Sequence, residues 1–570
     1  MNKQLTDHPK EGSHEGTAAA PDLQAALVDA ARKQAEENLR QSEEQLLNAE
    51  KFSSIAWLFG MPYPHDRLND AWQKTLFNQF HDLAAGSGIG IIYKDAQRDY
   101  DQVRWATNEI SATAMKALVS RINTSAAQGV PVLVFNPLAW ERSGLVTVSV
   151  QMPEASESVS VLDPENHVLP SQVLSNDAAT HTFKLLISAP NVPSLGYEVL
   201  HVIPGKRALA TDLKAAGLTL ENASLRVTVD KTTGCITSLY DKKNSFESLA
   251  SGACGNELQL FRDTPKEYDA WNIDPGTLDQ PPVKLTAADS VELIGQGPMT
   301  GSIRVTRHWQ SSKFVQEIVL HSGSDEVEVV NDIDWHETHE LLKAAFPLAA
   351  SSPMATYEIP YGTIDRPTTR NNSWEQAQFE VPALRWADLG NGQHGLSLIN
   401  ESKYGYDASG NVLRLSLLRS PVWPDPDADR GPQHFSFALY PHAGDWKQAL
   451  TVRHGYEFNY QLDAMQVGSH SGVMPARHSF VSVTPENVVL TAMKKAEDSD
   501  GLVFHLYEWA GKAGTIEIAL PPGATGATKT NLLEQPQGPA LAVTSGKVAL
   551  PVTPYEIIAV RVDYSPQKSK

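Results

Sequence analysis

Two histidines three positions apart, His336 and His339 in the segment WHETHE, have a spacing found among metal ligands. The order of residues differs from the zinc-binding pattern His-Glu-x-x-His, and the preceding residues EVEVVNDID follow a strand pattern. On an extended strand, residues three apart face opposite sides of the sheet. A structural or hydrogen-bonding role is therefore the favoured interpretation, and a metal site is the alternative.

Two carboxylates lie on the same predicted strand. Asp332 and Asp334 are two positions apart and share a face, where one proton between them would raise the pKa of one group, as a general acid requires. Carboxylates at strand edges and turns are far commoner without such a role. His336 and Glu337 are the nearest acid and base for an aldose epimerase, but neighbours on a strand point apart.

Two further segments combine aromatic rings with polar groups that could contact a sugar. The candidates are Trp271 and Asp274 in the first segment, and Arg366, Arg370, Asn371, Asn372 and Trp374 in the second. Aromatic rings stack on apolar faces of ligands, while guanidinium and amide groups hydrogen-bond to hydroxyls. Solvated turns explain both segments more readily.

Helices are predicted to come first along the chain. Residues 1–22 mix charged, Gly and small residues without a period and are predicted to form a disordered tail. The following pattern predicts a long helix ending near Gly60, a second helix with apolar residues four apart from Leu68 to Phe80, and a third from Gly90 to about Ile122. Short connections between them predict a three-helix bundle over residues 23–124.

The second helix runs into the adjacent residues His81 and Asp82. Neighbouring residues on one helix point to different faces, so these two by themselves make a poor metal site. A helix-end pair, in which Asp82 caps or pairs locally and His81 is packed, is the structural alternative.

The pattern changes near residue 125 to short β-type runs separated by Pro, Gly and Asn. The expected fold is therefore multidomain, with an α part followed by all-β sandwiches. The predicted divisions are a small β-sandwich at 125–212, a larger β domain at 213–446 and a C-terminal β-sandwich at 447–570. Cys235 and Cys254 are too few for a disulfide framework and are predicted to be free, buried thiols.

Charge and hydropathy argue against nucleic acid and membranes as partners. The 570-residue chain has 67 acidic and 47 basic residues, a formal net charge of −20, and no Lys/Arg run that could follow a phosphate backbone. Nucleic acid is therefore not expected as a partner. No apolar stretch is long enough to span a membrane, and residues 1–20 lack a signal core, so no membrane association and a cytoplasmic location are expected.

Several segments resemble the α-mannosidases of glycoside hydrolase family 38. WQKTLFNQFHDLAAGSGIGIIYKDA, residues 72–96, is similar to the family's central-domain signature, in which a helix ends in His-Asp before a Gly-Ser turn. The resemblance continues in order through VLVFNPLAWERSG, LRVTVDKTTGCITSLYDKKN, NELQLFRDTPKEYDAWNID, YEIPYGTIDRPTTRNNSWE and LRSPVWPDPDADRG. It covers most of the chain after about residue 30.

The resemblance implies a retaining, zinc-assisted hydrolysis of terminal α-mannosides, with a mannoside or oligosaccharide as the partner. It also implies a barrel-like catalytic domain, a three-helix bundle and β-sandwiches that include a galactose-mutarotase-like supersandwich, here residues 213–446. Of the family's zinc ligands, only the His of the His-Asp motif maps to this sequence, as His81. Asp82 takes the position of a residue that bonds a substrate hydroxyl.

The other metal-binding pattern of the family, His-x-Asp, is not found at any of the 18 histidines. The resemblance therefore implies that this chain holds no catalytic nucleophile or acid. The expected site residues are His81 for the metal, and Asp82, Trp271, Asp274, Arg370 and Trp374 for the substrate.

The expected function is that of an α-mannosidase-family protein that is inactive alone. A separate catalytic-domain chain or a homo-oligomer would complete its site. A non-catalytic carbohydrate-binding or scaffolding protein is the alternative, and a wrong gene start or a decayed remnant remains open.

Overall fold

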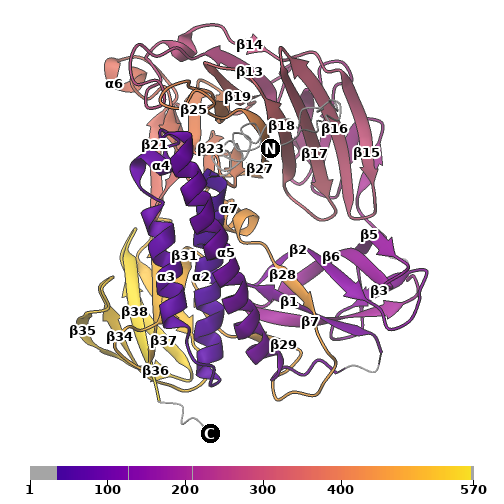
Figure 1. Cartoon of the computed structure of the whole chain (residues 1–570), viewed down its shortest axis with the longest axis vertical. Coiled ribbons are helices and arrows are strands. Elements are labelled where there is room, and N and C mark those ends of the chain that lie inside the picture. Colours follow the sequence, from indigo (N-terminus) through magenta and orange to yellow (C-terminus); the bar gives the residue numbers. More distant parts are fainter. Residues whose placement is uncertain (1–34, 126–127, 208–209, 566–570) are drawn as a thin grey trace, which may run out of the picture.

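The computed structural model describes residues 35–125, 128–207 and 210–565, which form a helical part and three β domains (Figure 1). Residues 1–34, which include the predicted tail and the start of the predicted first helix, lie outside the described residues. The expected combination of an α part with β-sandwich domains is confirmed.

The helical part precedes the β domains. It contains α2 (Ala35–Leu58), α3 (His65–Phe77), α4 (His81–Ala84) and α5 (Gly90–Val119). The three long helices contact one another, and Leu46, Ala49, Leu68, Val103 and Ile110 are buried between them. None of the helices in the described part of the chain combines the length and apolar character that a membrane span requires.

The small β domain packs two antiparallel sheets face to face. One sheet contains β1 (Val130–Asn136), β3 (Val159–Leu162), β4 (Val168–Leu169), β7 (Gly196–Pro204), β28 (Asp463–Gln466) and β29 (Arg477–Ser479), and the other β2 (Arg142–Gln151), β5 (Ser171–Asp177) and β6 (Thr182–Val192). Val132, Val134 and Leu200 of the first sheet share one core with Val148 and Ile187 of the second.

β28 and β29 come from a distant part of the sequence. Val132 of β1 pairs with Gln466 of β28, and Glu198 of β7 pairs with Arg477 of β29. The predicted division at residue 447 assigned this segment to the last domain. Local patterning identifies a strand but does not identify its partner, which here lies more than 250 positions away.

The large β domain contains three sheets. The nine-stranded sheet holds β15 (Ser290–Gln296), β16 (Thr300–Trp309), β17 (Ser312–His321), β18 (Val327–Trp335), β20 (Met354–Ile359), β21 (Gly362–Pro367), β23 (Trp386–Gly390), β24 (His394–Asn400) and β27 (Gly431–Ala443). The six-stranded sheet holds β13 (Glu257–Arg262), β14 (Val283–Lys284), β19 (Glu340–Pro347), β22 (Val381–Pro382), β25 (Gly405–Ser409) and β26 (Val412–Arg419). The five-stranded sheet holds β8 (Lys214–Ala216), β9 (Thr219–Glu221), β10 (Leu225–Val229), β11 (Ile236–Asp241) and β12 (Phe246–Glu247).

One core joins these three sheets. Val329 and Phe437 of the nine-stranded sheet, Leu260 and Leu342 of the six-stranded sheet and Val227 of the five-stranded sheet belong to the same buried cluster. Two short helical turns, η1 (Thr277–Asp279) and α6 (Ser373–Gln376), interrupt the connections.

The terminal β domain is a second two-sheet sandwich. One sheet contains β30 (Ser482–Thr484), β33 (Gly514–Ala519), β36 (Val543–Thr544) and β37 (Lys547–Val552), and the other β31 (Val488–Lys495), β32 (Gly501–Glu508), β34 (Ala524–Thr530), β35 (Pro536–Leu541) and β38 (Ile557–Tyr564). Its core contains Ile518 and Phe504 and continues into Phe52 and Ile55 of α2. The helical part and the terminal β domain therefore share apolar packing.

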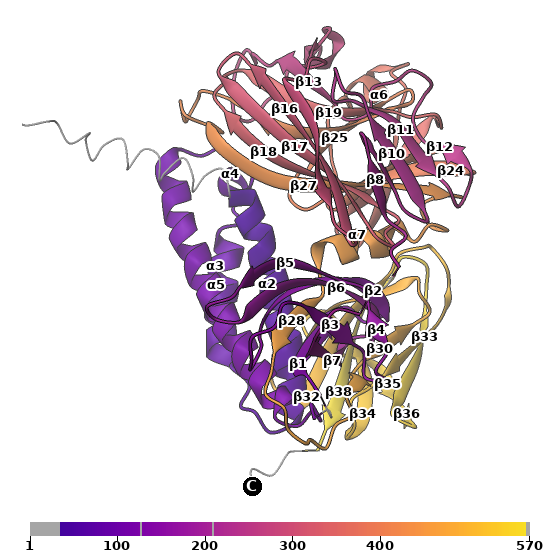
Figure 2. The same cartoon turned by 90° about the vertical axis from the view of Figure 1, so that its right-hand side faces the viewer.

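An aromatic junction surrounds the helix α7 (Thr451–Asn459), which lies between the large β domain and the other two β domains (Figure 2). One buried cluster joins Trp140 of the small domain, Trp386 of the large domain, Trp509 of the terminal domain, and Trp446 and Tyr456 around α7. All three β domains therefore contribute side chains to a single core.

The two cysteines correct a prediction made from the sequence. Cys235 and Cys254 form a disulfide, with their Cα atoms 5.0 Å apart, and are not free thiols. Residue Ile236 bridges to Gly255 through backbone hydrogen bonds, which sets the two preceding residues side by side. The sequence separation of 19 gave no signal of this bridge because the contact is made by non-local pairing.

Glu50 of α2 offers a test of how the helical part is buried. Its side chain is 8% exposed, and it accepts a hydrogen bond from Trp72. Burial raises the pKa of Glu50 from 4.5 to about 7. The folded protein therefore keeps a proton that the unfolded chain releases between these two pH values, so the free energy of unfolding falls as pH rises through this window.

We expect Glu50→Gln to raise the free energy of unfolding by about 1 to 3 kcal/mol at pH 8 and to leave it nearly unchanged at pH 4.5. The neutral amide lacks the cost of ionising a buried carboxyl group. Urea unfolding at both pH values measures the effect, with the exposed Glu109→Gln on α5 as the matched control. An equal gain at both pH values would contradict this account.

Candidate functional site

A break between α3 and α4 positions His81 and Asp82. The Asn78 side chain donates to the carbonyl of Lys74 (2.9 Å) and to Asp99 (3.0 Å), so it terminates α3. Phe80 then takes an extended conformation, and a new four-residue helix begins at His81. The prediction that the second helix runs into His81 is wrong, because α3 ends at Phe77, where the Asn78 side chain and backbone N–H both donate to the Lys74 carbonyl.

Within this short turn the two side chains approach each other. His81 Nε2 lies 3.4 Å from Asp82 Oδ2. The Ser87 hydroxyl donates to Asp82 Oδ1 at 3.3 Å, and Tyr93 donates to the backbone carbonyl of Asp82 at 3.2 Å. The His81 side chain remains 75% exposed, whereas that of Asp82 is 37% exposed. The imidazole is therefore open to a ligand, while the carboxylate is held in place.

Asp82 also contacts the large β domain. The Trp271 indole N–H donates to Asp82 Oδ1 at 3.3 Å, across 189 positions of sequence. α4 lies at the end of the helical part that faces this domain (Figure 1). Two residues predicted separately as substrate contacts, Asp82 and Trp271, are thus brought together by the fold.

The loop that carries Trp271 is held by a buried ion pair. Arg419 Nε donates to Asp263 Oδ2 at 2.5 Å, and its Nη atoms donate to the carbonyls of Asp269, Ala270 and Asn272. Asp263 is only 1% exposed. Burial raises the pKa of the Asp263 carboxyl, and the neighbouring Arg419 opposes this shift. The guanidinium fork therefore ties the loop backbone to β26.

Asp269 joins this loop to a second one. Its Oδ2 accepts hydrogen bonds from the backbone N–H groups of Val422 (2.6 Å) and Trp423 (3.2 Å) and lies 3.1 Å from His339 Nε2. As a result the rings of Trp271 and Trp423 lie 5.3 Å apart. Sequence reasoning missed Trp423 and Asp269, although both stand in segments that carry the family resemblance.

Three exposed aromatic rings lie beside the His81–Asp82 pair and the Trp271 side chain that contacts it. Phe80, Trp271 and Trp423 are 58%, 44% and 54% exposed. Such rings offer apolar faces, and an adjacent carboxylate accepts hydrogen bonds from hydroxyl groups. The arrangement is chemically suited to a sugar, which presents both kinds of surface.

The remaining predicted substrate contacts lie in ordered turns. Asp274 Oδ2 accepts from the backbone N–H of Lys266 at 3.0 Å, close to the Trp271 loop. Arg370 donates to the carbonyls of Pro367, Thr369 and Ala408, and Trp374 on α6 is 83% exposed. Their roles in substrate binding stay predictions.

The other sequence candidates form separate histidine–carboxylate contacts. His336 Nε2 lies 2.9 Å from Asp334, whereas His339 contacts Asp269, so the two histidines address different carboxylates. Asp332 pairs with His434 at 2.6 Å. Although burial opposes it, the hydrogen bond to Asp332 raises the pKa of His434. Asp332 and Asp334 therefore each contact a different histidine.

A zinc ion needs three or four protein ligands. His81 and Asp82 offer two groups, and Asp82 already accepts hydrogen bonds from Ser87 and Trp271. Among the described residues, three potential ligands meet only at Asp163, Glu165 and His167, in the small β domain. His81 fits as one ligand, but the described residues around it do not form a complete zinc site.

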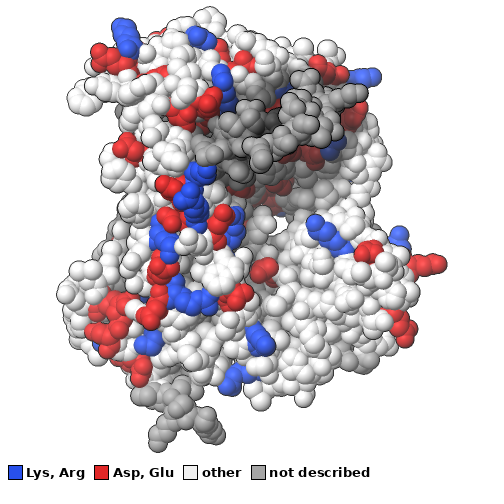
Figure 3. All heavy atoms as spheres, in the orientation of Figure 1, with Lys and Arg blue, Asp and Glu red and all other residues white. Residues whose placement is uncertain are grey.

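Charged side chains of both signs lie on the face of the molecule that carries the helices (Figure 3). The face shown in Figure 3 carries acidic and basic side chains interspersed along the helices, without a continuous basic stripe. Such a mixture does not resemble the positive footprint of a nucleic-acid-binding face.

Three family models match the chain. The α-mannosidase middle domain matches residues 30–118, the glycosyl hydrolases family 38 C-terminal domain matches 220–427, and the family 38 C-terminal β-sandwich domain matches 487–560. The first match contains His81 and Asp82, and the second contains Trp271 and Trp423. The two sides of the candidate site therefore fall in different matched domains.

Curated relatives are about twice as long as the chain. It is 32% identical to α-mannosidase 2C1 of Mus musculus over 534 residues, covering 91% of this chain and 48% of that protein. It is 31% identical to the Homo sapiens protein of the same name over 543 residues, covering 92% of this chain and 48% of that protein. The chain thus spans about half the length of the curated relatives that it matches.

Solved structures show the same fold. An α-mannosidase from Enterococcus faecalis V583 superposes with a TM-score of 0.80 at 17% identity, covering 93% of this chain and 68% of that one. A protein in glycosyl hydrolase family 38 from Enterococcus faecalis superposes with a TM-score of 0.79 at 17% identity, covering 94% of this chain and 71% of that one.

Removing Arg419 tests whether the ion pair holds the Trp271 loop. We expect Arg419→Ala to lower the free energy of unfolding by about 3 to 5 kcal/mol, because the buried Asp263 carboxylate loses its partner. Proteolytic cleavage within residues 263–274 should accelerate. Urea unfolding and mass-mapped limited proteolysis measure the two effects. Arg98→Ala is the control, because it removes an exposed ion pair with Asp95 (2.9 Å). Equal effects of the two variants on unfolding and on cleavage would refute the role of Arg419 in holding the Trp271 loop.

Proposed function

Because the chain belongs to glycoside hydrolase family 38, of which it contains the middle domain and both C-terminal β domains, we propose that it takes part in the hydrolysis of terminal α-mannosides. The contact between Asp82 and Trp271 carries this proposal. It joins a carboxylate of the helical part to an exposed ring of the large β domain. In this proposal Asp82 accepts a hydrogen bond from a mannoside hydroxyl, and Trp271 and Trp423 contact the apolar face of the sugar.

His81 is the proposed zinc ligand of this chain. An exposed imidazole next to the substrate-binding carboxylate is suited to this role, and zinc would supply a Lewis acid that orients sugar hydroxyls. The other ligands would come from residues outside the described site. The helical part and residues 213–446 would correspond to the family's three-helix bundle and mutarotase-like supersandwich.

An exposed apolar patch adjoins His81. It consists of Phe77, Phe80, Ile89 and Ile91, which are 74%, 58%, 50% and 52% exposed. Such a patch beside a polar site is typical of an interaction surface. We therefore propose that a barrel-like catalytic domain covers the patch and provides the nucleophile and the acid. By itself the chain would then be inactive.

A non-catalytic carbohydrate-binding role is the second candidate. It is favoured by the same exposed rings, since Trp271 and Trp423 can contact a sugar without any metal or nucleophile. Binding of methyl α-D-mannoside without hydrolysis, even after a catalytic domain is supplied, would support this alternative.

Hydrolysis of a chromogenic α-mannoside tests the proposal. We expect no activity from the purified chain at any zinc concentration. Activity should appear when the segment of mouse α-mannosidase 2C1 that this chain does not match is added. His81→Ala should then lower this activity by about 10- to 100-fold, as loss of a metal ligand or its support does.

His308→Ala provides the matched control, because it removes a half-exposed histidine that pairs with Asp289 far from α4. Zinc-dependent release of mannose by the chain alone would defeat the proposal of a partner. Reconstituted activity that survives His81→Ala would defeat the role of His81.

A further inference from the structure

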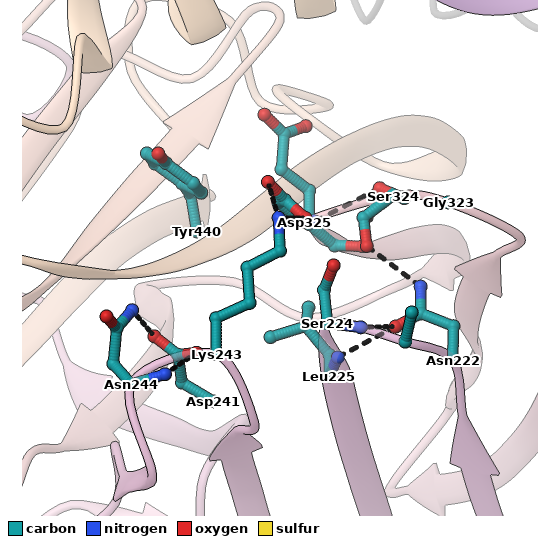
Figure 4. Close-up of polar contacts among 12 residues, drawn as sticks. Asn222, Ser224, Leu225, Asp241, Lys243, Asn244, Gly323, Ser324, Asp325 and Tyr440 are labelled. Carbon is teal, nitrogen blue, oxygen red and sulfur yellow. Dashed lines mark hydrogen bonds and ion pairs between the residues drawn. The ribbon is translucent and has the colours of Figure 1, made fainter.

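The large β domain contains a pocket on its side next to α7, with a volume of about 210 Å³. It is lined by strand β10, the β11–β12 turn, the β17–β18 turn, β27 and the segment before α7. It shares no residue with the site around His81, and Figure 4 shows its polar groups.

One ion pair and one hydrogen-bonded pair fix the polar rim of the pocket. Lys243 Nζ donates to both carboxylate oxygens of Asp325, at 2.6 and 2.7 Å, and so connects two turns from different sheets. Asp241 is 3% exposed and accepts from the backbone N–H (3.1 Å) and the side-chain amide (2.6 Å) of Asn244. The charged groups are therefore held in a defined geometry.

The pocket retains hydrogen-bonding capacity. Ser224 is 4% exposed, and its hydroxyl makes no hydrogen bond with the described residues. Asn222 fixes the Ser224 backbone by accepting from its N–H at 2.9 Å. Asn244 donates through Nδ2, which leaves its carbonyl oxygen available, and Gln448 accepts through Oε1, which leaves its N–H groups available.

The walls of the pocket are rigid. The Tyr440 ring stacks on His454 at 3.8 Å, and its hydroxyl donates to the carbonyl of Ala449 at 3.0 Å. His442 is 4% exposed and lies 2.7 Å from Asp388 and 3.2 Å from Ser397. In Figure 4, Tyr440 and Ser224 lie on either side of the Lys243–Asp325 pair. An aromatic wall thus faces a set of donors and acceptors.

We propose that this pocket binds one pyranose ring of a neutral sugar. Lys243 is neutralised by Asp325, so the pocket has no free cation for an anionic ligand. Available donors and acceptors are mixed, as hydroxyl groups require, since each hydroxyl both donates and accepts. The volume is below the roughly 300 to 1,000 Å³ of sites for drug-sized ligands, so a single ring fits better than an oligosaccharide.

Titration calorimetry of the full chain with D-mannose, D-glucose and D-galactose tests this inference. At least one of these monosaccharides should bind, and Asn244→Ala and Gln448→Ala should each weaken its binding about fivefold, the effect of one lost hydrogen bond. Both side chains are exposed, so the fold should survive, which thermal melting checks. The control Lys547→Ala removes an exposed ion pair with Glu517 in the terminal β domain, and it should leave the affinity for the sugar unchanged.

The variants Asp82→Ala and Trp271→Ala separate this pocket from the site near His81. Binding that persists in both and weakens in the pocket variants supports the inference. Binding that is lost in Asp82→Ala and unaffected by the pocket variants overturns it and leaves the proposed mannosidase function standing. The inference is also overturned if none of the three sugars binds.

Discussion

The aromatic junction around α7 is the contact on which the rest of the structure depends. Trp386, Trp446 and Trp509 pack in one buried cluster that joins three β domains. Arg385 lies over the Tyr456 ring at 4.0 Å and pairs with Glu358 at 2.7 Å, which fixes α7 against the large domain. Because α2 shares its core with the terminal domain, this junction sets the position of the helices relative to the large domain. The 3.3 Å contact between Asp82 and Trp271 requires that position.

The two sides of the candidate site are supported in different ways. The Trp271 loop is ordered by buried charge, since Asp263 and Asp269 bind Arg419 and backbone N–H groups within the large domain. α4 has only four residues, and it is held by the packing of Leu83 against Tyr93 and by hydrogen bonds to Asp82 from Ser87 and Tyr93. A pre-organised aromatic loop therefore meets a short turn whose histidine remains open. This asymmetry suits a site in which one side recognises a ligand and the other awaits further groups.

Sequence patterns predicted what local chemistry determines. The long helices follow from apolar residues three and four apart. The resemblance pointed to Asp82, and the combination of an aromatic ring with a nearby carboxylate pointed to Trp271. The break after α3 was missed because one polar residue, Asn78, outweighs an otherwise helical pattern through its contacts with Lys74 and Asp99. The Cys235–Cys254 bridge, the pairing of β28 with β1, and the place of Trp423 beside Trp271 depend on contacts between distant segments. Periodicity carries no information about such contacts.

The two proposed sugar sites differ in how much they require from outside the described residues. The pocket beside Lys243 is lined mainly by the large β domain, and its one lysine is already paired with Asp325 within the fold. The His81 site lies at the edge of two domains, next to the exposed ring of Phe80, and among the described residues its imidazole pairs with one carboxylate, that of Asp82. Desolvation by a covering surface would strengthen every polar interaction at His81. Binding in the large domain can therefore be independent of assembly, whereas chemistry at His81 depends on it.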